Sequence, residues 1–262
     1  QTGVVFGRAA GFTSRNFTAE LVGNDPMGQI AKSVARYWQK YRQGVMLKIL
    51  GAVMGVTGGS GNAKKWHDTH IADLSSSTAE AYTIGDTDLN DLATQALGDN
   101  KSLFSLVIMH SNVAKTLENK QLLEYWKQTD ANGIQRPLNL ASMNGYTVII
   151  DDGVPAVPVG GSEANKGLTK YTTYLLGSGV LRTAKARLDH PNDVEYNPAK
   201  NGGQEMLYTR IRETIHPNGF SFKVPSSNWT ESPSPEQLAA SANWTIQYDP
   251  KAIPMAALIT NG

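Results

Sequence analysis

Apolar residues recur every three or four positions along one segment near the N-terminus, at Met27, Ile30, Ala31, Val34, Trp38, Tyr41, Val45, Ile49 and Val53. This spacing is typical of an α-helix that buries one side. Asp25 is suited to cap such a helix, and Pro26 fits its first turn, where a missing N–H costs nothing. The pattern predicts one helix over about residues 26–55. Its length of roughly 40–45 Å at about 1.5 Å per residue indicates a scaffold element.

Two segments with different sequence patterns follow this helix. Residues 57–65 are rich in Gly and predict a flexible loop; they lack the Gly-Lys-Ser/Thr ending of a phosphate-binding loop. Residues 88–97 place Leu and Ala on one face and predict a helix, which Asp86 or Thr87 is suited to cap.

The middle of the chain alternates between apolar runs and polar stretches. The runs over 103–109 and 146–151 have the length of buried strands. Between them we expect a helix over about 112–126, begun by His110 and Ser111, and a polar, turn-like segment over 133–140.

The last third of the chain alternates between apolar and polar positions, which is typical of half-buried strands. We expect strands over 170–176 and 206–215, with a turn at 216–220 after the second. The remaining expected elements are a polar excursion over 188–203, a strand over 221–224, a short helix over 235–241 capped by Ser234, and closing strands over 244–248 and 254–260. One very long helix followed by mixed strands and helices predicts an α+β fold.

Composition narrows the class of protein. The chain has 262 residues, 40% of them hydrophobic, and a net charge of +1. It contains no apolar run of the roughly 18 residues that a membrane span needs. The N-terminus lacks the apolar core of a signal peptide, so we expect neither a membrane anchor nor secretion. The absence of cysteine excludes disulfides and cysteine nucleophiles.

Positive charge is concentrated on the long helix. Residues 26–67 contain no Asp or Glu, whereas basic residues recur through the helix at Lys32, Arg36, Lys40, Arg42 and Lys48. A locally basic element in a nearly neutral chain suits contact with a polyanion or with an acidic surface of another protein. The alternative is that these charges are solvated or pair with acids of a neighbouring subunit.

Several short motifs carry candidate chemistry, and each has a simpler interpretation. His67 and His70 are three residues apart and lack the Glu of a metalloprotease helix, so we expect no metal site. Asp86, Asp88 and Asn90 begin like a calcium loop, but Asp91 stands where Gly is needed, so a helix cap is the better account.

The remaining candidates are expected to be structural. His110-Ser111 has no nucleophile elbow around it, His216 precedes a Pro-Asn-Gly turn, and Asp151-Asp152 ends a strand. Most tryptophans are expected in the core, with subunit contact as the alternative; they are Trp38, Trp66, Trp126, Trp229 and Trp244. The N-x-Thr sequons at Asn16, Asn228 and Asn243 carry no meaning without secretion.

The order of these segments resembles the major capsid proteins of tailed bacteriophages, whose fold is named after phage Hong Kong 97. The resemblance covers nearly the whole chain, and no single piece of it is diagnostic. It is carried by Gly23-Asn24-Asp25-Pro26-Met27, Ala35-Arg36-Tyr37-Trp38, Leu47-Lys48-Ile49-Leu50-Gly51, the stretches 105–111, 145–152 and 171–179, Arg210 to Glu213, and His216 to Phe220.

The resemblance implies a fold and a division of the chain. The long helix would be the spine helix of a peripheral domain built from residues 1–100. Residues 101–221 would form mainly an axial domain around five-fold and six-fold axes, and residues 222–262 would return to the peripheral domain. Relatives carry an N-terminal arm and an extended loop before the spine helix. Only 24 residues precede Asp25 here. The chain is therefore expected to be a subunit without those segments.

The resemblance also implies a function. Copies would assemble into pentamers and hexamers of an icosahedral head around double-stranded DNA, with no enzyme activity and no cofactor. Further partners would be portal and scaffolding proteins, with assembly in the host cytoplasm. The basic face of the helix would lie toward the lumen and screen DNA phosphates without reading sequence. The alternatives are the shell of an encapsulin-like protein nanocompartment and, third, an α/β hydrolase-type enzyme.

Overall fold

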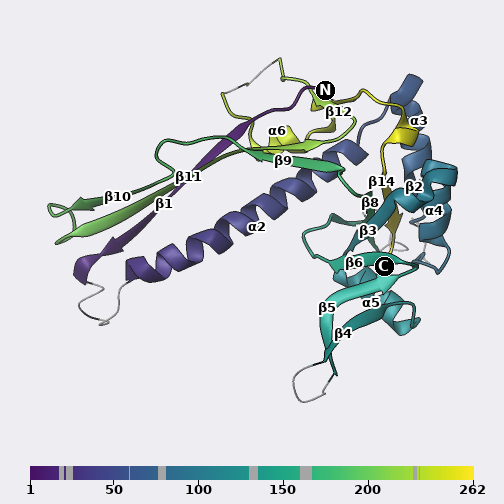
Figure 1. Ribbon diagram of the computed structural model, residues 1–262, viewed down its shortest axis with the longest axis horizontal. Coiled ribbons are helices and arrows are strands. Elements are labelled where there is room, and N and C mark those ends of the chain that lie inside the picture. The colour runs from purple at the N-terminus through teal and green to yellow at the C-terminus, as the bar shows by residue number, and fades with distance from the viewer. Residues whose placement is uncertain are drawn as a thin grey trace.

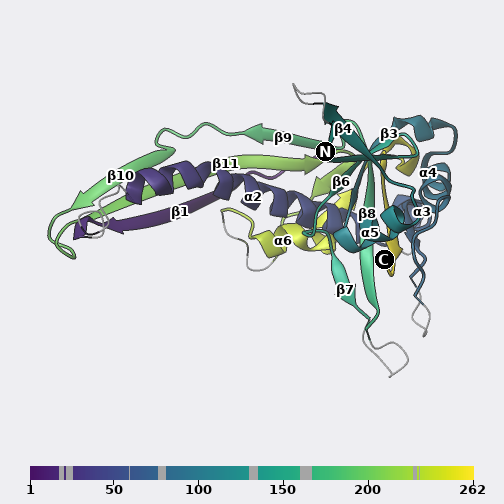
Figure 2. The ribbon, with the colours of Figure 1, turned by 90° about the horizontal axis from the view of Figure 1, so that it is seen from below.

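The protein has a long arm that projects from a compact body, as the computed structural model shows (Figure 1). The structure describes residues 1–17, 21, 26–58, 60–75, 81–129, 135–159, 167–226, 229 and 231–262. The arm combines one long helix with a narrow sheet, and the two lie side by side in both views (Figures 1 and 2). The body holds a larger sheet and the shorter helices.

The long helix α2 spans Pro26–Met54, which confirms the helix expected over 26–55. Its last ten residues carry most of its buried side chains, because this end runs into the body. Val45, Ile49, Leu50 and Val53 are each at most 2% exposed. The expected cap, Asp25, lies outside the described residues.

The arm sheet lies along α2. Strand β11 (Gln204–Pro217) is its centre and pairs antiparallel with β1 (Phe6–Arg15) on one side. On its other side it pairs with β10 (Asn192–Asn197) and β9 (Leu181–Lys185), one after the other. Strand β1 was not predicted, because two Gly and two Ala leave its sequence with little apolar alternation.

The body sheet contains eight strands in the described residues, and its main order is β2-β14-β8-β3-β6-β5-β4. Its strands are β2 (Ile71–Asp73), β3 (Phe104–Met109), β4 (Glu124–Thr129), β5 (Gln135–Met143), β6 (Tyr146–Ile150), β7 (Ala156–Pro158), β8 (Thr169–Gly177) and β14 (Met255–Thr260). Strand β3 is parallel to β6 and antiparallel to β8.

Two clusters of buried side chains hold the molecule together. One joins the body end of α2 to β8, β11 and the C-terminal segments, and includes Trp66, Phe220 and Trp244. The other packs helices α4 (Asp88–Leu97) and α5 (Ser111–Asn119) against the body sheet, through residues such as Leu92 and Leu117. The remaining elements are α3 (Gly61–His70), the 3-10 helices η1 (Gly98–Leu103), η3 (Ser241–Asn243) and η4 (Pro250–Ala252), the short pair β12 (Phe220–Phe222) and β13 (Trp244–Ile246), and α6 (Pro235–Ala239).

Three expected segments are wrong. Most of the loop expected over 57–65 belongs to α3, which forms because Ala63, Trp66 and His70 repeat at helical spacing and pack inward. The helix expected over 112–126 ends at Asn119, where Gln121 adopts a positive φ of 57° and breaks the regular backbone. The polar stretch expected as a turn over 133–140 contains strand β5 from Gln135 onward, paired with β4 and β6.

The polar excursion expected over 188–203 contains strand β10, which was not predicted. Most other predicted elements are confirmed, with small shifts at their ends. Helix α4 matches the expected 88–97, and strands β3, β6, β8 and β11 lie within two residues of the predicted ones. Ser234 caps α6 in a reciprocal capping box with Gln237. Asn218-Gly219 turns the chain after β11, and Gly219 has a φ of +93° that favours glycine.

Candidate interaction surfaces

Three of the five basic residues singled out on the long helix form one exposed stripe. Lys32, Arg36 and Lys40 are spaced by four residues, so they return to the same side of α2. We define these three residues as the basic stripe. Within the described residues no ion pair or hydrogen bond joins them to another side chain. Arg36 and Lys40 border a shallow pocket that also contains Asp151.

Arg42 does not belong to this stripe, because it points toward the arm sheet. Its Nε donates to Oε2 of Glu213 on β11 at 2.6 Å. The Glu213 side chain is only 3% exposed, and its second carboxylate oxygen has no partner among the described residues. A buried carboxylate needs a cation beside it, so Arg42 serves the fold.

Lys48 also points away from the stripe, toward α6. Its Nζ lies 3.9 Å from Oε1 of Glu236, and both side chains are largely exposed. Backbone and Ser234 hydrogen bonds at the start of α6, helped by the charge of Lys48, hold the pKa of Glu236 below its usual value. The five-residue basic face predicted from the sequence therefore divides into a free stripe and two paired cations.

Aromatic and polar contacts fix the arm half of α2 onto the sheet. The Trp38 indole donates a hydrogen bond to the Thr209 hydroxyl, and Tyr37 packs edge-on against Phe12 with ring centroids 5.7 Å apart. Arg8 on β1 donates to the Tyr41 hydroxyl at 2.7 Å. Sequence reasoning missed the Phe12 and Arg8 contacts because β1 was not recognised.

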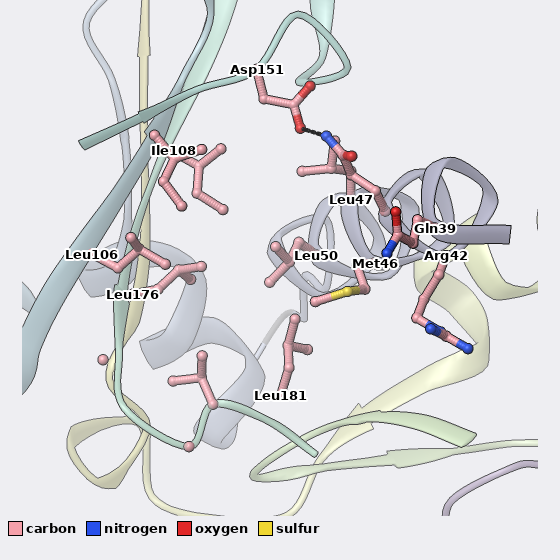
Figure 3. Close-up of a pocket in the computed structure, with 15 residues that line it drawn as sticks. Gln39, Arg42, Met46, Leu47, Leu50, Leu106, Ile108, Asp151, Leu176 and Leu181 are labelled. Carbon is pink, nitrogen blue, oxygen red and sulfur yellow. Dashed lines mark hydrogen bonds between the residues drawn. The ribbon is translucent and has the colours of Figure 1, made fainter. Parts of the chain in front are cut away.

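A cavity of about 560 Å³ lies where the arm meets the body (Figure 3). Apolar side chains of α2, β3 and β8 line it, among them Leu50, Ile108 and Leu176. At its rim Gln43 of α2 donates a hydrogen bond to Asp151. The lining carries one arginine and one carboxylate and no histidine, so it lacks the convergent acids and bases of a hydrolytic site.

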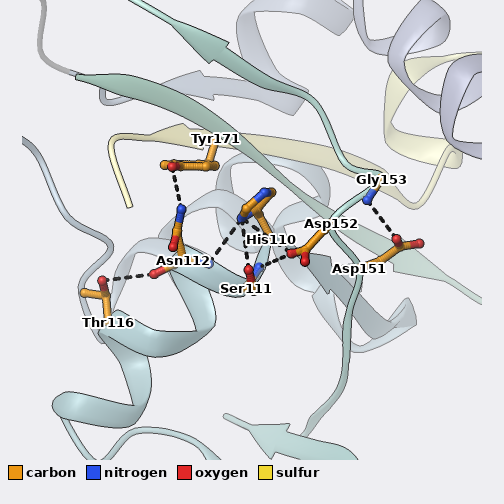
Figure 4. Close-up of polar contacts among 8 residues, drawn as sticks. All are labelled: His110, Ser111, Asn112, Thr116, Asp151, Asp152, Gly153 and Tyr171. Carbon is orange, nitrogen blue, oxygen red and sulfur yellow. Dashed lines mark hydrogen bonds and ion pairs between the residues drawn. The ribbon is translucent and has the colours of Figure 1, made fainter. Parts of the chain in front are cut away.

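His110 and Asp152 were singled out separately and lie together at the start of α5 (Figure 4). His110 Nδ1 accepts from the Asn112 N–H at 3.1 Å, which places its proton on Nε2. Ser111 Oγ and Asp152 Oδ1 approach the same nitrogen, at 3.5 and 3.7 Å. A catalytic triad needs the serine and the carboxylate on opposite ring nitrogens. The cluster is a helix cap, and Asp152 completes it by accepting from the Ser111 N–H.

His67 and His70, for which no metal site was expected, have different surroundings. His67 is half exposed beside Asp68. His70 is buried and stacked on Trp66 at 4.4 Å, and its Nε2 has no partner among the described residues. Burial lowers the pKa of His70 to about 4. No group of three potential metal ligands occurs in the described part of the chain.

The remaining candidates also have structural roles. Asp88 accepts a hydrogen bond from the Gly85 N–H at 2.8 Å and organises the start of α4, whereas Thr87 makes no side-chain cap. His216 lies in β11, one residue before its end. The Asn228 sequon lies outside the described residues, and no described helix is long and apolar enough to cross a membrane.

Three of the four tryptophans whose side chains the structure describes follow the core expectation, and Trp229 does not. Trp38, Trp66 and Trp244 are buried, and Trp229 is 37% exposed. The side chain of Trp126 lies outside the described part.

Comparisons with known proteins place the chain among phage capsid proteins. No protein-family model matches the chain. It is 30% identical over 246 residues to the major capsid protein of Bacillus phage SPP1, covering 94% of this chain and 68% of that protein. The capsid protein of Ralstonia phage GP4 superposes with a TM-score of 0.62 at 10% identity, over 99% of this chain and 74% of that one. The cyanophage Pam1 capsid gives a TM-score of 0.56 at 9% identity, over 99% and 76%.

Proposed function

Because this chain belongs to the major capsid proteins of tailed bacteriophages, we propose that its copies assemble as pentamers and hexamers into an icosahedral head around double-stranded DNA. The protein is a structural component of the virion, with the Hong Kong 97-type α+β fold, and is not an enzyme. The similarity to a phage capsid protein over 94% of the chain carries this conclusion.

The exposed arm supports assembly with other copies. Between Met27 and Gly44, α2 buries only Trp38 among its described side chains. Large side chains stay exposed on the arm, including Tyr196 at 54% and Val194 at 65%. A subunit inside a closed shell has neighbours to cover such surfaces, whereas a monomer does not.

We propose the peripheral and axial division with two adjustments to the expected boundaries of 1–100, 101–221 and 222–262. Strand β11 pairs with β1, and β9 and β10 pair with β11. These strands belong with the arm, so the peripheral part takes residues 181–217. Helix α4 shares the buried cluster of β3 and α5, so the axial part takes residues 88–97.

Microscopy of the full-length protein tests assembly. Shells of uniform size are expected in negative stain after expression and purification. A preparation that stays monodisperse and monomeric under all assembly conditions would contradict the proposed function. The encapsulin-like shell and the hydrolase gain no support from the 30% identical relative, which is a phage capsid protein.

We propose that the basic stripe faces the lumen and screens packaged DNA. Its three cations are exposed and lack partners among the described residues, whereas Arg42 and Lys48 are paired within the chain. Portal and scaffolding proteins, and assembly in the host cytoplasm, belong to the same proposal.

Neutralising the basic stripe tests the contact with DNA. Lys32→Gln, Arg36→Gln and Lys40→Gln together should lower the amount of DNA retained per head and weaken its dependence on salt, because each phosphate contact releases a counterion. Shell yield should stay unchanged. The control removes three exposed lysines elsewhere, Lys185→Gln, Lys200→Gln and Lys223→Gln. Equal DNA content in both triple variants contradicts the assignment of the stripe.

A further inference from the structure

Within the described residues, the arm sheet has no partner strand on the outer edge of β1. In an antiparallel pair, alternate residues point their N–H and C=O groups away from the partner strand. Arg210 and Arg212 point theirs away from β1, since they bond Pro191 and Ala186 on the far side of β11. The backbone N–H and C=O groups of their partners, Ala9 and Gly7, therefore point away from β11. Those of Gly11 and Thr13 do the same, because they follow in the same alternation.

Only one end of this edge is satisfied within the described residues. The Ser232 hydroxyl accepts from the Gly7 N–H at 2.9 Å, and Arg8 donates to the Gly7 carbonyl at 2.6 Å. The outward groups of Ala9, Gly11 and Thr13 have no such partner among the described residues, and all three residues are exposed.

The outer edge of β1 also lacks the sequence features that prevent strands of two molecules from pairing. Soluble proteins place Lys, Pro, a bulge or a covering segment there. The stretch from Ala9 to Thr13 has no charge and no proline, and its register with β11 is regular. Its regular register suits main-chain pairing with another strand.

An apolar pocket of about 400 Å³ lies beside this edge, on the side where α2 packs. Phe12 of β1 forms one wall, and Ile30, Val34 and Tyr37 of α2 form the other. Tyr37 is 45% exposed. A strand added to β1 would place alternate side chains over this pocket, so the edge offers hydrogen bonds and apolar contact together.

We propose that β1 pairs antiparallel with β1 of a second copy across a two-fold axis perpendicular to the sheet, centred near Gly11. Ala9 of each copy then lies opposite Thr13 of the other. Outward-pointing residues face each other, and α2 stays on the same side of the joined sheet in both copies. A closed shell requires this, because every copy presents the same face to the lumen. The inference rests on the proposed shell assembly.

The opposite edge of the sheet, β10, suits this pairing less well. A two-fold centred on Val194 would place Asp193 of one copy opposite Glu195 of the other. Like charges directly opposite each other are destabilising. The β1 edge carries no such pair, so charge favours β1 over β10 for this pairing.

Cysteine cross-linking tests the pairing cleanly, because these 262 residues contain no cysteine. The Gly11→Cys substitution is tolerated sterically, since a Cβ there would lie 3.8 Å from Tyr208. Paired residues of this type have Cα atoms about 5.5 Å apart, within the disulfide range of roughly 4.4–6.8 Å. Mild oxidation of assembled full-length shells should convert Gly11→Cys chains into dimers on non-reducing gels.

Two control variants test whether the cross-link is specific to the β1 edge. Arg210→Cys lies on the same face but one strand further in, so two copies would be at least about 14 Å apart, given strand spacings of ~4.8 Å, and no dimer should form. Val194→Cys reports pairing at the β10 edge. If Gly11→Cys does not assemble, mixed Ala9→Cys and Thr13→Cys chains give the same test through a heterodimer.

The outcomes separate this inference from the proposed function. Intact shells without a Gly11→Cys dimer, or with a dimer only at Val194→Cys, overturn the β1 pairing and leave shell assembly standing. A β1 edge covered by another segment of the same chain also gives shells without a dimer. Failure of the unsubstituted protein to form shells overturns the proposed function itself.

Discussion

The arm half and the body half of α2 form one continuous helix in opposite surroundings. Among residues 27–44 only Trp38 is buried, whereas Val45, Ile49, Leu50 and Val53 are at most 2% exposed. The body half is held by apolar burial within the chain. The arm half is held by a few directed contacts, namely the Arg42–Glu213 pair, the Trp38–Thr209 hydrogen bond and the Arg8–Tyr41 hydrogen bond.

This difference separates folding from assembly. Side chains at the body end of α2 stabilise the subunit before any other copy is present. The arm end leaves apolar and charged groups exposed that a second copy or DNA can contact. Substitutions in the two halves should therefore affect different measurements, stability in one and assembly in the other.

The largest effect is expected where the arm depends on a buried charge. Arg42→Ala leaves the Glu213 carboxylate buried without its cation, which typically costs about 3–5 kcal/mol in the free energy of unfolding. Urea unfolding of the purified subunit measures this cost. Lys48→Ala serves as the control and should leave the unfolding midpoint unchanged, because its pair with Glu236 is exposed. Equal losses of unfolding free energy in the two variants would contradict the claim that Arg42 compensates the buried charge of Glu213.

Matched isoleucines compare the two halves of α2 directly. Ile49→Ala should lower the free energy of unfolding by about 2–5 kcal/mol, because Ile49 is completely buried. Ile30→Ala should cost about 1 kcal/mol or less, because Ile30 is only half buried on the arm. Thermal or urea unfolding of unassembled subunits compares them. Similar losses at both positions would mean that the arm half is covered as well as the body half.

Acid pH should lower the free energy of unfolding, because it protonates the buried His70. Burial lowers the pKa of this imidazole from 6.5 to about 4, and the backbone of Pro250, the backbone of Ile253 and the charge of Asp249 oppose the shift only in part. The folded state therefore binds fewer protons than the unfolded chain. The stability contributed by neutral His70 is complete above about pH 6.5 and is lost progressively as the pH falls toward 4, by roughly 2–3 kcal/mol.

Unfolding free energies between pH 7 and pH 4 measure this loss. His70→Phe should flatten the pH dependence, because it removes the buried titrating group. His67→Gln, a change at the half-exposed histidine on the same helix, should leave it unchanged. An unaltered pH profile in His70→Phe would mean that other groups dominate the acid response.

Much of the fold could be predicted from periodicity. The long helix, α4 and the strands β3, β6, β8 and β11 have strong apolar patterns, and all are confirmed. Strand β1 escaped because glycine and alanine carry little signal, and α3 escaped because a preceding glycine-rich stretch suggested a loop. Strand β5 is polar in sequence and is a strand only because β4 and β6 lie on either side of it.

The sequence by itself determined the long amphipathic helix, the concentration of positive charge along it and the resemblance to capsid proteins, because periodicity and composition are local properties. Only the tertiary structure decided which cations are free, since Glu213 lies 171 residues from Arg42 along the chain. It also brought His110 to Asp152 as a cap, and among the described residues it left β1 with a partner strand on one side alone. These features depend on which strands and side chains meet in space, and pairing between distant segments leaves no local pattern in a single sequence.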